Sequence, residues 1–363
     1  MTSLDGALAY RRLRAQHLIG AAHDSPAETV RWMGALQAQD YAQALWAIGA
    51  RTASATLACV EQAISARQIV RTWPMRGTIH FVPARDAAWM GALCTPRSIA
   101  AAALRQEQLE LDDRILGRCG EILRRELAGA GPMSRPELLR RIEAHGVPVG
   151  AQRGYHILVH HAQRGLVVLG PMIDKQQSYV LLDEWITDPV QLSRSDALQE
   201  LALRYFRSHG PATVHDFANW SNLAMADARA GLEAAGGSLA LEVRDGVRYW
   251  MDPSHSDVEA SHSVAVQLLP GFDEYLLGYK DRSAVISVAN AARIVPGANG
   301  VFKPMIVESG QITGTWSRTT KARGIELTLT FFTRRRRAKR DIAAACAKYL
   351  AFAGQPLLKL TCA

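Results

Sequence analysis

The sequence predicts an α+β fold, because a group of two or three helices followed by a short β-hairpin occurs three times before the pattern changes. The three groups are expected over residues 1–110, 111–190 and 191–260. Helices backed by a two-stranded wing are the order of elements in a winged helix, a form of helix-turn-helix, so three tandem winged-helix units are predicted. Over residues 261–363, short apolar runs separated by Gly, Pro and Asn predict a small C-terminal β-barrel or a β-sandwich.

The third group carries the clearest local signals. The residues from Thr213 to Asp216 have the pattern of a helix capping box, and Gly236 ends the last helix of the group. Asp245 and Gly246 form a dipeptide that suits a type I′ turn between two strands. The expected elements are helices over 196–208, from 213 onward and over 225–235, and strands over 239–244 and 247–251.

The two earlier groups repeat these signals. Ser134 to Glu137 and Ser25 to Glu28 both match a capping box, and each contains a Pro that is tolerated in the first turn of a helix. In the middle group, helices are expected over 114–127, from 134 to Gly146 and over 151–163, with strands over 166–169 and 178–182. In the first group, helices are expected from 25 to about 35, over 42–50 and over 57–66, with strands over 69–73 and 78–82.

The expected C-terminal barrel rests on a series of short apolar segments. Strands are expected over 265–269, 285–286, 305–308, 311–316 and 325–332. The last segment of helical composition, residues 341–352, is expected to pack against that sheet.

Composition limits the classes of function. The net charge of +8 favours polyanions such as nucleic acid as partners. The five cysteines are scattered and never spaced as C-x-x-C, so we expect no disulfide framework, no metal site and no cofactor. No apolar run is long enough for a signal core or a membrane span, so we expect a cytoplasmic, nucleoid-associated protein that does not bind membranes.

Gln37 and Gln39 lie in a short link between one helix that ends near Ala35 and another that starts near Asp40. In an extended link, side chains two residues apart point to the same face, whereas on an α-helix they would point about 200° apart. The pair can therefore form a joint site, or it can merely satisfy backbone groups between the helices. Asp40 is expected to be the N-cap of the second helix.

Basic side chains cluster in three places that could contact phosphates. The first predicted wing holds a group that includes His80, which could instead be a hydrogen-bonded strand residue. A second group follows Trp316, and a dense basic run follows the last predicted strand. The candidate DNA contacts are Arg71, Arg76, His80, Arg318, Lys321, Arg323, Arg334, Arg335, Arg336 and Arg337.

Several other conspicuous residues are expected to be structural. Core packing is expected for Trp73 and Trp89, and a structural role for His160 and His161, which lack a third metal ligand at useful spacing. Asp273 and Glu274 are expected to pair with arginines, or else to line a cleft.

Seven short segments, spread over nearly the whole chain, together resemble motifs of the AlkZ-like winged-helix DNA glycosylase superfamily. They are MGALQAQD at 33–40, ALWA at 44–47, RTWPMRGTIH at 71–80, LPGFDEYLLG at 269–278, DR at 281–282, NGVFKP at 299–304 and GTW at 314–316. The resemblance implies three tandem winged helices, a C-terminal β-barrel, and an active site with a glutamine-x-glutamine motif, here Gln37 and Gln39. It also implies excision of alkylated purines, or the unhooking of interstrand crosslinks, in damaged double-stranded DNA.

Two neutral amides can suffice for this chemistry. A purine alkylated at N3 or N7 is already cationic, so it leaves without a general acid through an oxocarbenium-like transition state. Glutamine carbonyl oxygens can orient the attacking water and place a negative dipole beside the developing cation.

The sequence also allows a winged-helix DNA-binding protein or regulator without catalysis. A protein-interaction scaffold is a third alternative, but the basic net charge argues against it. Three winged helices in one chain favour a monomer that wraps DNA.

Overall fold

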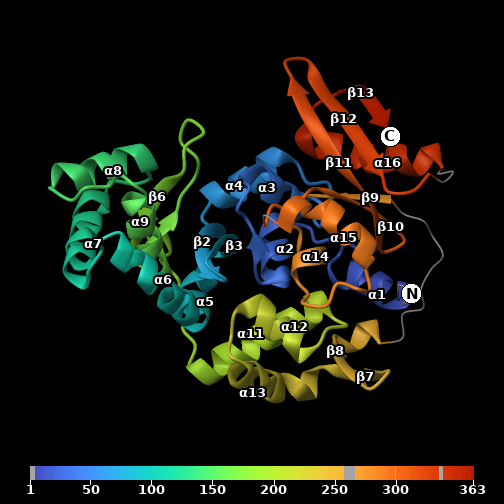
Figure 1. The fold of residues 1–363 in the computed structure, drawn as a ribbon, viewed down its shortest axis with the longest axis horizontal. Helices are drawn as coiled ribbons and strands as arrows, with labels where there is room; N and C mark the ends of the chain where they lie inside the picture. Colours follow the sequence, from blue (N-terminus) through green and yellow to red (C-terminus); the bar gives the residue numbers. More distant parts are fainter. Residues whose placement is uncertain (1–4, 257–265, 299, 335–337) are drawn as a thin grey trace.

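A computed structural model describes residues 5–256, 266–298, 300–334 and 338–363, and all structural statements concern these residues. The first helical group, in blue, lies at the centre of Figure 1. The middle group, in green, lies to its left, the third group, in yellow, lies below it, and the C-terminal sheet, in red, lies above it. No helix in the described ranges combines the length and the hydropathy needed to cross a membrane.

The first group has the predicted order of helices followed by a hairpin. Ser25 and Asp40 cap the second and third helices through backbone N–H groups three residues later, as predicted. Two further helices follow the hairpin. The elements are α1 (Gly6–Ala15), α2 (Pro26–Met33), β1 (Leu36–Gln37), α3 (Tyr41–Gly49), α4 (Leu57–Ser65), β2 (Ile69–Met75), β3 (Thr78–Pro83), α5 (Ala87–Cys94) and α6 (Pro96–Gln108).

The middle and third groups also follow the predicted order. Thr213 and Asp216 form the predicted capping box, and Asp245 and Gly246 take φ angles of 48° and 77°, as a type I′ turn requires. The middle group consists of α7 (Asp113–Leu127), β4 (Met133–Ser134), α8 (Arg135–Ala144), α9 (Arg153–Gln163), β5 (Val167–Leu169), β6 (Ser178–Leu181) and α10 (Leu182–Trp185). The third consists of α11 (Arg194–His209), α12 (Val214–Ser221), α13 (Met225–Ala235), β7 (Ala240–Arg244) and β8 (Val247–Met251).

The hairpins of the first two groups join into one sheet. Its strand order is β1-β3-β2-β5-β6-β4, and Arg71 of β2 pairs with Leu169 of β5. Every residue of β2 is buried, so this strand needs a partner along its second edge and cannot remain a free wing. The sheet separates two cores, because Ile69 and Phe81 face one hydrophobic cluster whereas Val70 and Val82 face the other.

The predicted closed C-terminal β-barrel is not found among the described residues. The strands form an open sheet in the order β13-β12-β11-β10-β9, and within the described residues the edge strands β9 and β13 do not pair with each other. The segment 285–286 contains no strand. The elements are β9 (Val266–Leu269), α14 (Glu274–Leu277), α15 (Val288–Ile294), β10 (Met305–Glu308), β11 (Gln311–Lys321), β12 (Gly324–Phe331), α16 (Lys339–Ala353) and β13 (Leu357–Cys362).

The helix α16 explains why the sheet need not close on itself. Its buried face holds Tyr349 and Phe352, and both rings lie 5.1 Å from the ring of Trp46 on α3. The apolar face of the sheet is therefore covered by a helix and by the first group, as we predicted for the helix. Trp73 and Trp89 are also buried, as predicted.

Candidate active site

Gln37 is the last residue of the two-residue strand β1, and Gln39 lies in the link between that strand and α3. Leu36 and Ala38 are completely buried, whereas Gln37 is half-buried and Gln39 is exposed. This alternation of buried and more exposed residues places Gln37 and Gln39 on the same outer side of the segment, as the sequence predicts. Strand β1 runs antiparallel to β3, with Gln37 opposite His80.

The two amides have different surroundings. Gln39 Oε1 accepts a hydrogen bond from the backbone N–H of Ile79 at 3.3 Å. The side chain of Gln37 makes no hydrogen bond within the part of the chain that the structure describes. Gln37 can therefore bind a water molecule or a ligand directly, and Gln39 can do so with its second lone pair or its NH₂ group.

A buried carboxylate lies directly behind Gln37. Glu274, at the start of α14, accepts hydrogen bonds from the backbone N–H of Gln37 at 3.2 Å and from Trp220 Nε1 at 2.9 Å. Its side chain is fully buried, and Arg76 and His209 lie 3.6 and 3.7 Å from its oxygens. Burial opposes ionisation, but the proximity of His209 and Arg76 outweighs it and lowers the pKa of Glu274 to about 2. A negative charge therefore lies beneath β1 at neutral pH.

His80 connects this carboxylate cluster to β3. Its Nδ1 lies 2.9 Å from the carbonyl oxygen of Thr78, which can only accept, so Nδ1 carries the proton. Its Nε2 then accepts from Arg76 Nη2 at 2.9 Å. Burial and the Arg76 charge lower the pKa of His80 to about 3, so the imidazole is neutral.

The expectation that Arg71 contacts phosphates from the first wing is not met, and His80 is the hydrogen-bonded strand residue that the sequence offered as the alternative to a DNA contact. His80 is completely buried and Arg71 is only 2% exposed, because the two wings have fused into one sheet. The Arg71 guanidinium stacks 4.4 Å from the ring centre of Tyr41, and burial lowers its pKa to about 10. Arg76 is different, because 18% of its side chain is exposed.

The neighbouring carboxylate, Asp273, confirms the predicted pairing with arginine. Arg51 binds both of its oxygens, at 2.8 and 2.9 Å, and both side chains are fully buried. Arg51 also donates to Gln16 Oε1 at 2.7 Å. The pair joins the chain just after α3 to the residue that caps α14. It therefore holds the start of α14, where Glu274 lies, in place against the first group.

Sequence reasoning missed His209 and Trp220 as members of the cluster. They lie on α11 and α12, more than fifty residues before Glu274, and no local motif connects the three. His160 and His161 are buried, as a structural role requires, and His161 Nε2 bonds the carbonyl of Leu116 at 3.0 Å. Within the described ranges no three His, Cys, Asp or Glu side chains gather into a possible metal site.

The remaining predicted DNA contacts lie elsewhere. Arg318 is half-buried and donates to the hydroxyl of Tyr349, whereas Lys321 and Arg323 are exposed at the turn between β11 and β12, which projects at the top of Figure 1. Arg334 is exposed. Arg335, Arg336 and Arg337 lie outside the described residues.

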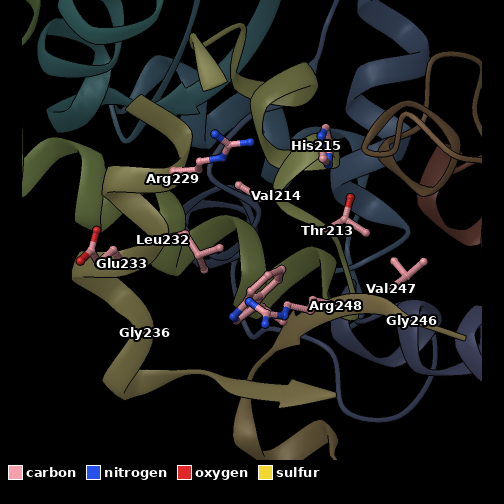
Figure 2. A pocket seen from close by; sticks show the side chains of 11 residues that line it. Thr213, Val214, His215, Arg229, Leu232, Glu233, Gly236, Gly246, Val247 and Arg248 are labelled. Carbon is pink, nitrogen blue, oxygen red and sulfur yellow. The ribbon is translucent and has the colours of Figure 1, made fainter. Parts of the chain in front are cut away.

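A separate hollow of about 720 Å³ lies between α12, α13 and β8 (Figure 2). His215, Arg229 and Arg248 line it around a half-buried Trp250. None of these three basic side chains forms an ion pair or hydrogen bond with a residue that the structure describes. The hollow contains no residue of β1, β3 or α14, so it is distinct from the glutamine site.

Comparison with known proteins decides the family. The family described as DNA glycosylase AlkZ-like matches residues 30–352. The chain belongs to the AlkZ-like DNA glycosylase family. This confirms the resemblance of the sequence motifs, and the AlkZ-like match includes Gln37, Gln39, Arg76 and Glu274.

Two comparisons extend this finding. An interstrand DNA cross-link repair glycosylase of Streptomyces sahachiroi is 23% identical over 84% of this chain and 85% of its own length. The solved structure of the Streptomyces sahachiroi DNA glycosylase AlkZ matches with a TM-score of 0.82 and 20% identity, covering 100% of both chains. The AlkZ-like chain thus shares that fold over its full length.

Proposed function

We propose that this AlkZ-like protein is a DNA glycosylase that excises cationic alkylated purines, with Gln37 and Gln39 directing water to the N-glycosidic bond. The observation that carries the proposal is the segment of β1 and the link after it, which has both amides on its outer side and leaves the Gln37 amide without a partner among the described residues. Because a similar protein is named an interstrand DNA cross-link repair glycosylase, we include the unhooking of crosslinks in the proposed activity.

The chemistry matches the polarity of the site. An alkylated purine is cationic before cleavage, and it leaves as a neutral base because it takes the electron pair of the N-glycosidic bond. The positive charge passes to the sugar, so the enzyme must place a water molecule and stabilise a cationic sugar. The carbonyl oxygen of Gln37 can accept a hydrogen bond from that water, while a buried carboxylate lies behind the strand. A neutral amide is neither a strong base nor a general acid, so it cannot protonate the leaving base of an undamaged nucleoside, and undamaged nucleosides should be poor substrates.

The partner is double-stranded DNA, bound by a monomer in the cytoplasm near the nucleoid. Lys321, Arg323 and Arg334 are exposed and are proposed phosphate contacts, and the run 335–337 keeps that proposed role. The groups 1–110, 111–190 and 191–260 are proposed to act as winged-helix units, because each contains helices followed by a hairpin.

The test is excision from duplexes that carry a single N7-methylguanine or a defined interstrand crosslink, scored as alkali-labile abasic sites. Gln37→Ala and Gln39→Ala should each slow single-turnover excision by about 10- to 1000-fold while DNA affinity stays within about twofold. Excision at the wild-type rate by both variants would refute the glutamine mechanism.

Gln43 provides a matched control for Gln39. Its Oε1 accepts one backbone hydrogen bond, from Gly271 at 3.1 Å, just as Gln39 accepts one from Ile79. Gln43 lies on α3, so Gln43→Ala removes the same kind of structural bond away from the glutamine pair, and it should lower the melting temperature as Gln39→Ala does without slowing excision.

The hollow of Figure 2 favours one second candidate, a DNA-binding protein without catalysis. Arg229 and Arg248 present two cations from α13 and β8 that have no partner among the described residues, which suits contact with a duplex. If the wild-type protein binds DNA but releases no base from any alkylated or crosslinked duplex, this second function replaces the first.

A further inference from the structure

Arg76 occupies an unusual backbone position beside the glutamines. It forms, with Gly77, the two-residue turn between β2 and β3, where Met75 pairs with Thr78. Arg76 has a φ of 54°, a conformation that a residue with a Cβ atom rarely adopts. Such a conformation persists only where surrounding contacts hold it, and it is frequent at binding sites.

Two side chains hold the Arg76 guanidinium from behind. Nη2 donates to His80 Nε2 at 2.9 Å and lies 3.6 Å from Glu274 Oε1. Both partners are completely buried, whereas Arg76 is partly exposed. The guanidinium is thus fixed on its inner side and reaches solvent on its outer side.

The outer donors of Arg76 have no partner in the described part of the chain. Nε and Nη1 form no hydrogen bond with any residue in the described ranges, and neither is a buried unsatisfied atom. An arginine that served only to neutralise Glu274 would turn its donors inward, yet Gln37 and Trp220 already supply the hydrogen bonds of that carboxylate. The outer donors of Arg76 therefore suit an external anion.

The same contacts fix Arg76 relative to the glutamines. Glu274 Oε1 faces Arg76 and also accepts the backbone N–H of Gln37, so one atom connects the two. His80 bonds Arg76 and pairs with Gln37 across β1 and β3, and its neighbour Ile79 bonds Gln39. An anion on Arg76 would be held at a constant distance from both amides.

We propose that Arg76 binds a phosphodiester of the damaged strand beside the target nucleotide, with Glu274 and His80 as its positioning residues. This inference rests on the proposed glycosylase function. Phosphate is the anion that DNA offers, and a guanidinium binds it with two parallel hydrogen bonds. Holding that phosphate restricts the sugar relative to the water on Gln37, and such restriction lowers the barrier of the reaction.

The test combines an arginine variant with a neutral phosphate. Duplexes with one N7-methylguanine carry a single methylphosphonate, moved one linkage at a time through the phosphates that flank the lesion. One linkage should slow single-turnover excision by the wild-type protein about 10- to 100-fold, and Arg76→Gln should slow excision of the ordinary duplex by a similar factor. The two effects should not add, because each removes the same interaction.

Further variants separate this role from a structural one. Arg76→Gln should reduce the salt slope of DNA binding by about one, because it removes a positive charge. Arg76→Lys keeps that charge but cannot form two parallel hydrogen bonds, so the salt slope should stay unchanged while excision slows. Arg85→Gln is the control, because Arg85 is 57% exposed and paired with Asp188 at 2.9 Å, away from the site. Glu274→Gln should lose sensitivity to the methylphosphonate, and if this variant fails to fold, the Arg76 variants still decide.

The two proposals fail in different ways. If the wild-type protein excises the base but Arg76→Gln matches its rate, or if the two effects add, the phosphate contact is wrong and the glycosylase function stands. If the wild-type protein releases no base from any duplex, the proposed function is wrong, and the inference fails with it.

Discussion

The buried pair of Arg51 and Asp273 should be among the most sensitive points of the molecule. Their side chains have no solvent exposure, and two hydrogen bonds of 2.8 and 2.9 Å join them. Asp273 also caps α14 by accepting from the N–H of Tyr275 at 2.8 Å. Asp273→Asn keeps the size of the side chain but leaves the guanidinium without a counter-charge.

The expected cost follows from this burial. Breaking one side of a buried ion pair leaves a desolvated charge, which costs about 3–5 kcal/mol in the free energy of unfolding. Arg51→Met should lower the free energy of unfolding by a similar amount, because it leaves the buried Asp273 carboxylate without its counter-charge. The double variant Arg51→Met with Asp273→Leu removes both charges, so it should be clearly more stable than the sum of the single changes predicts.

Urea unfolding followed by tryptophan fluorescence measures these free energies, since the chain has eight tryptophans. Because Glu274 follows Asp273, Asp273→Asn should also slow base excision at temperatures where the variant is folded. Destabilisation below about 1 kcal/mol for both single variants, or strictly additive effects, would refute the reasoning.

Two further predictions concern pH and salt. Burial lowers the pKa of His80 to about 3 and that of His161 to about 4, from an ordinary value of 6.5, so the unfolded chain binds protons that the native protein rejects. The melting temperature should therefore fall as the pH falls from about 6.5 to about 4. In the His161→Gln variant this decrease should be smaller than in the wild-type protein. The same decrease in both proteins would exclude His161 as a contributor. DNA affinity should decrease as the salt concentration rises. Lys321→Ala, Arg323→Ala or neutralisation of residues 334–337 should each lower the salt slope by about one for every phosphate that the variant no longer neutralises. Titrations at several salt concentrations measure this slope, and an unchanged slope would show that the substituted side chains contact solvent and not DNA.

Local chemistry determined much of this protein. The capping box at Thr213, the N-cap at Asp40 and the turn at Asp245 each depend on neighbouring residues, and the structure contains all three. The extended link that aligns Gln37 with Gln39 is equally local, because the two helices that flank it fix its ends. The family motifs could also be recognised from the sequence, because each motif is a contiguous segment of the chain.

Tertiary packing decided which distant residues meet. The fusion of two wings buried Arg71 and His80, which no single hairpin could reveal, and helix α16 covered a sheet that we expected to close as a barrel. Glu274 meets Trp220 and Gln37 only because α14 packs between the first and third groups. Such contacts depend on which apolar faces and strand edges pair over long separations, and spacing along the chain carries no information about that choice.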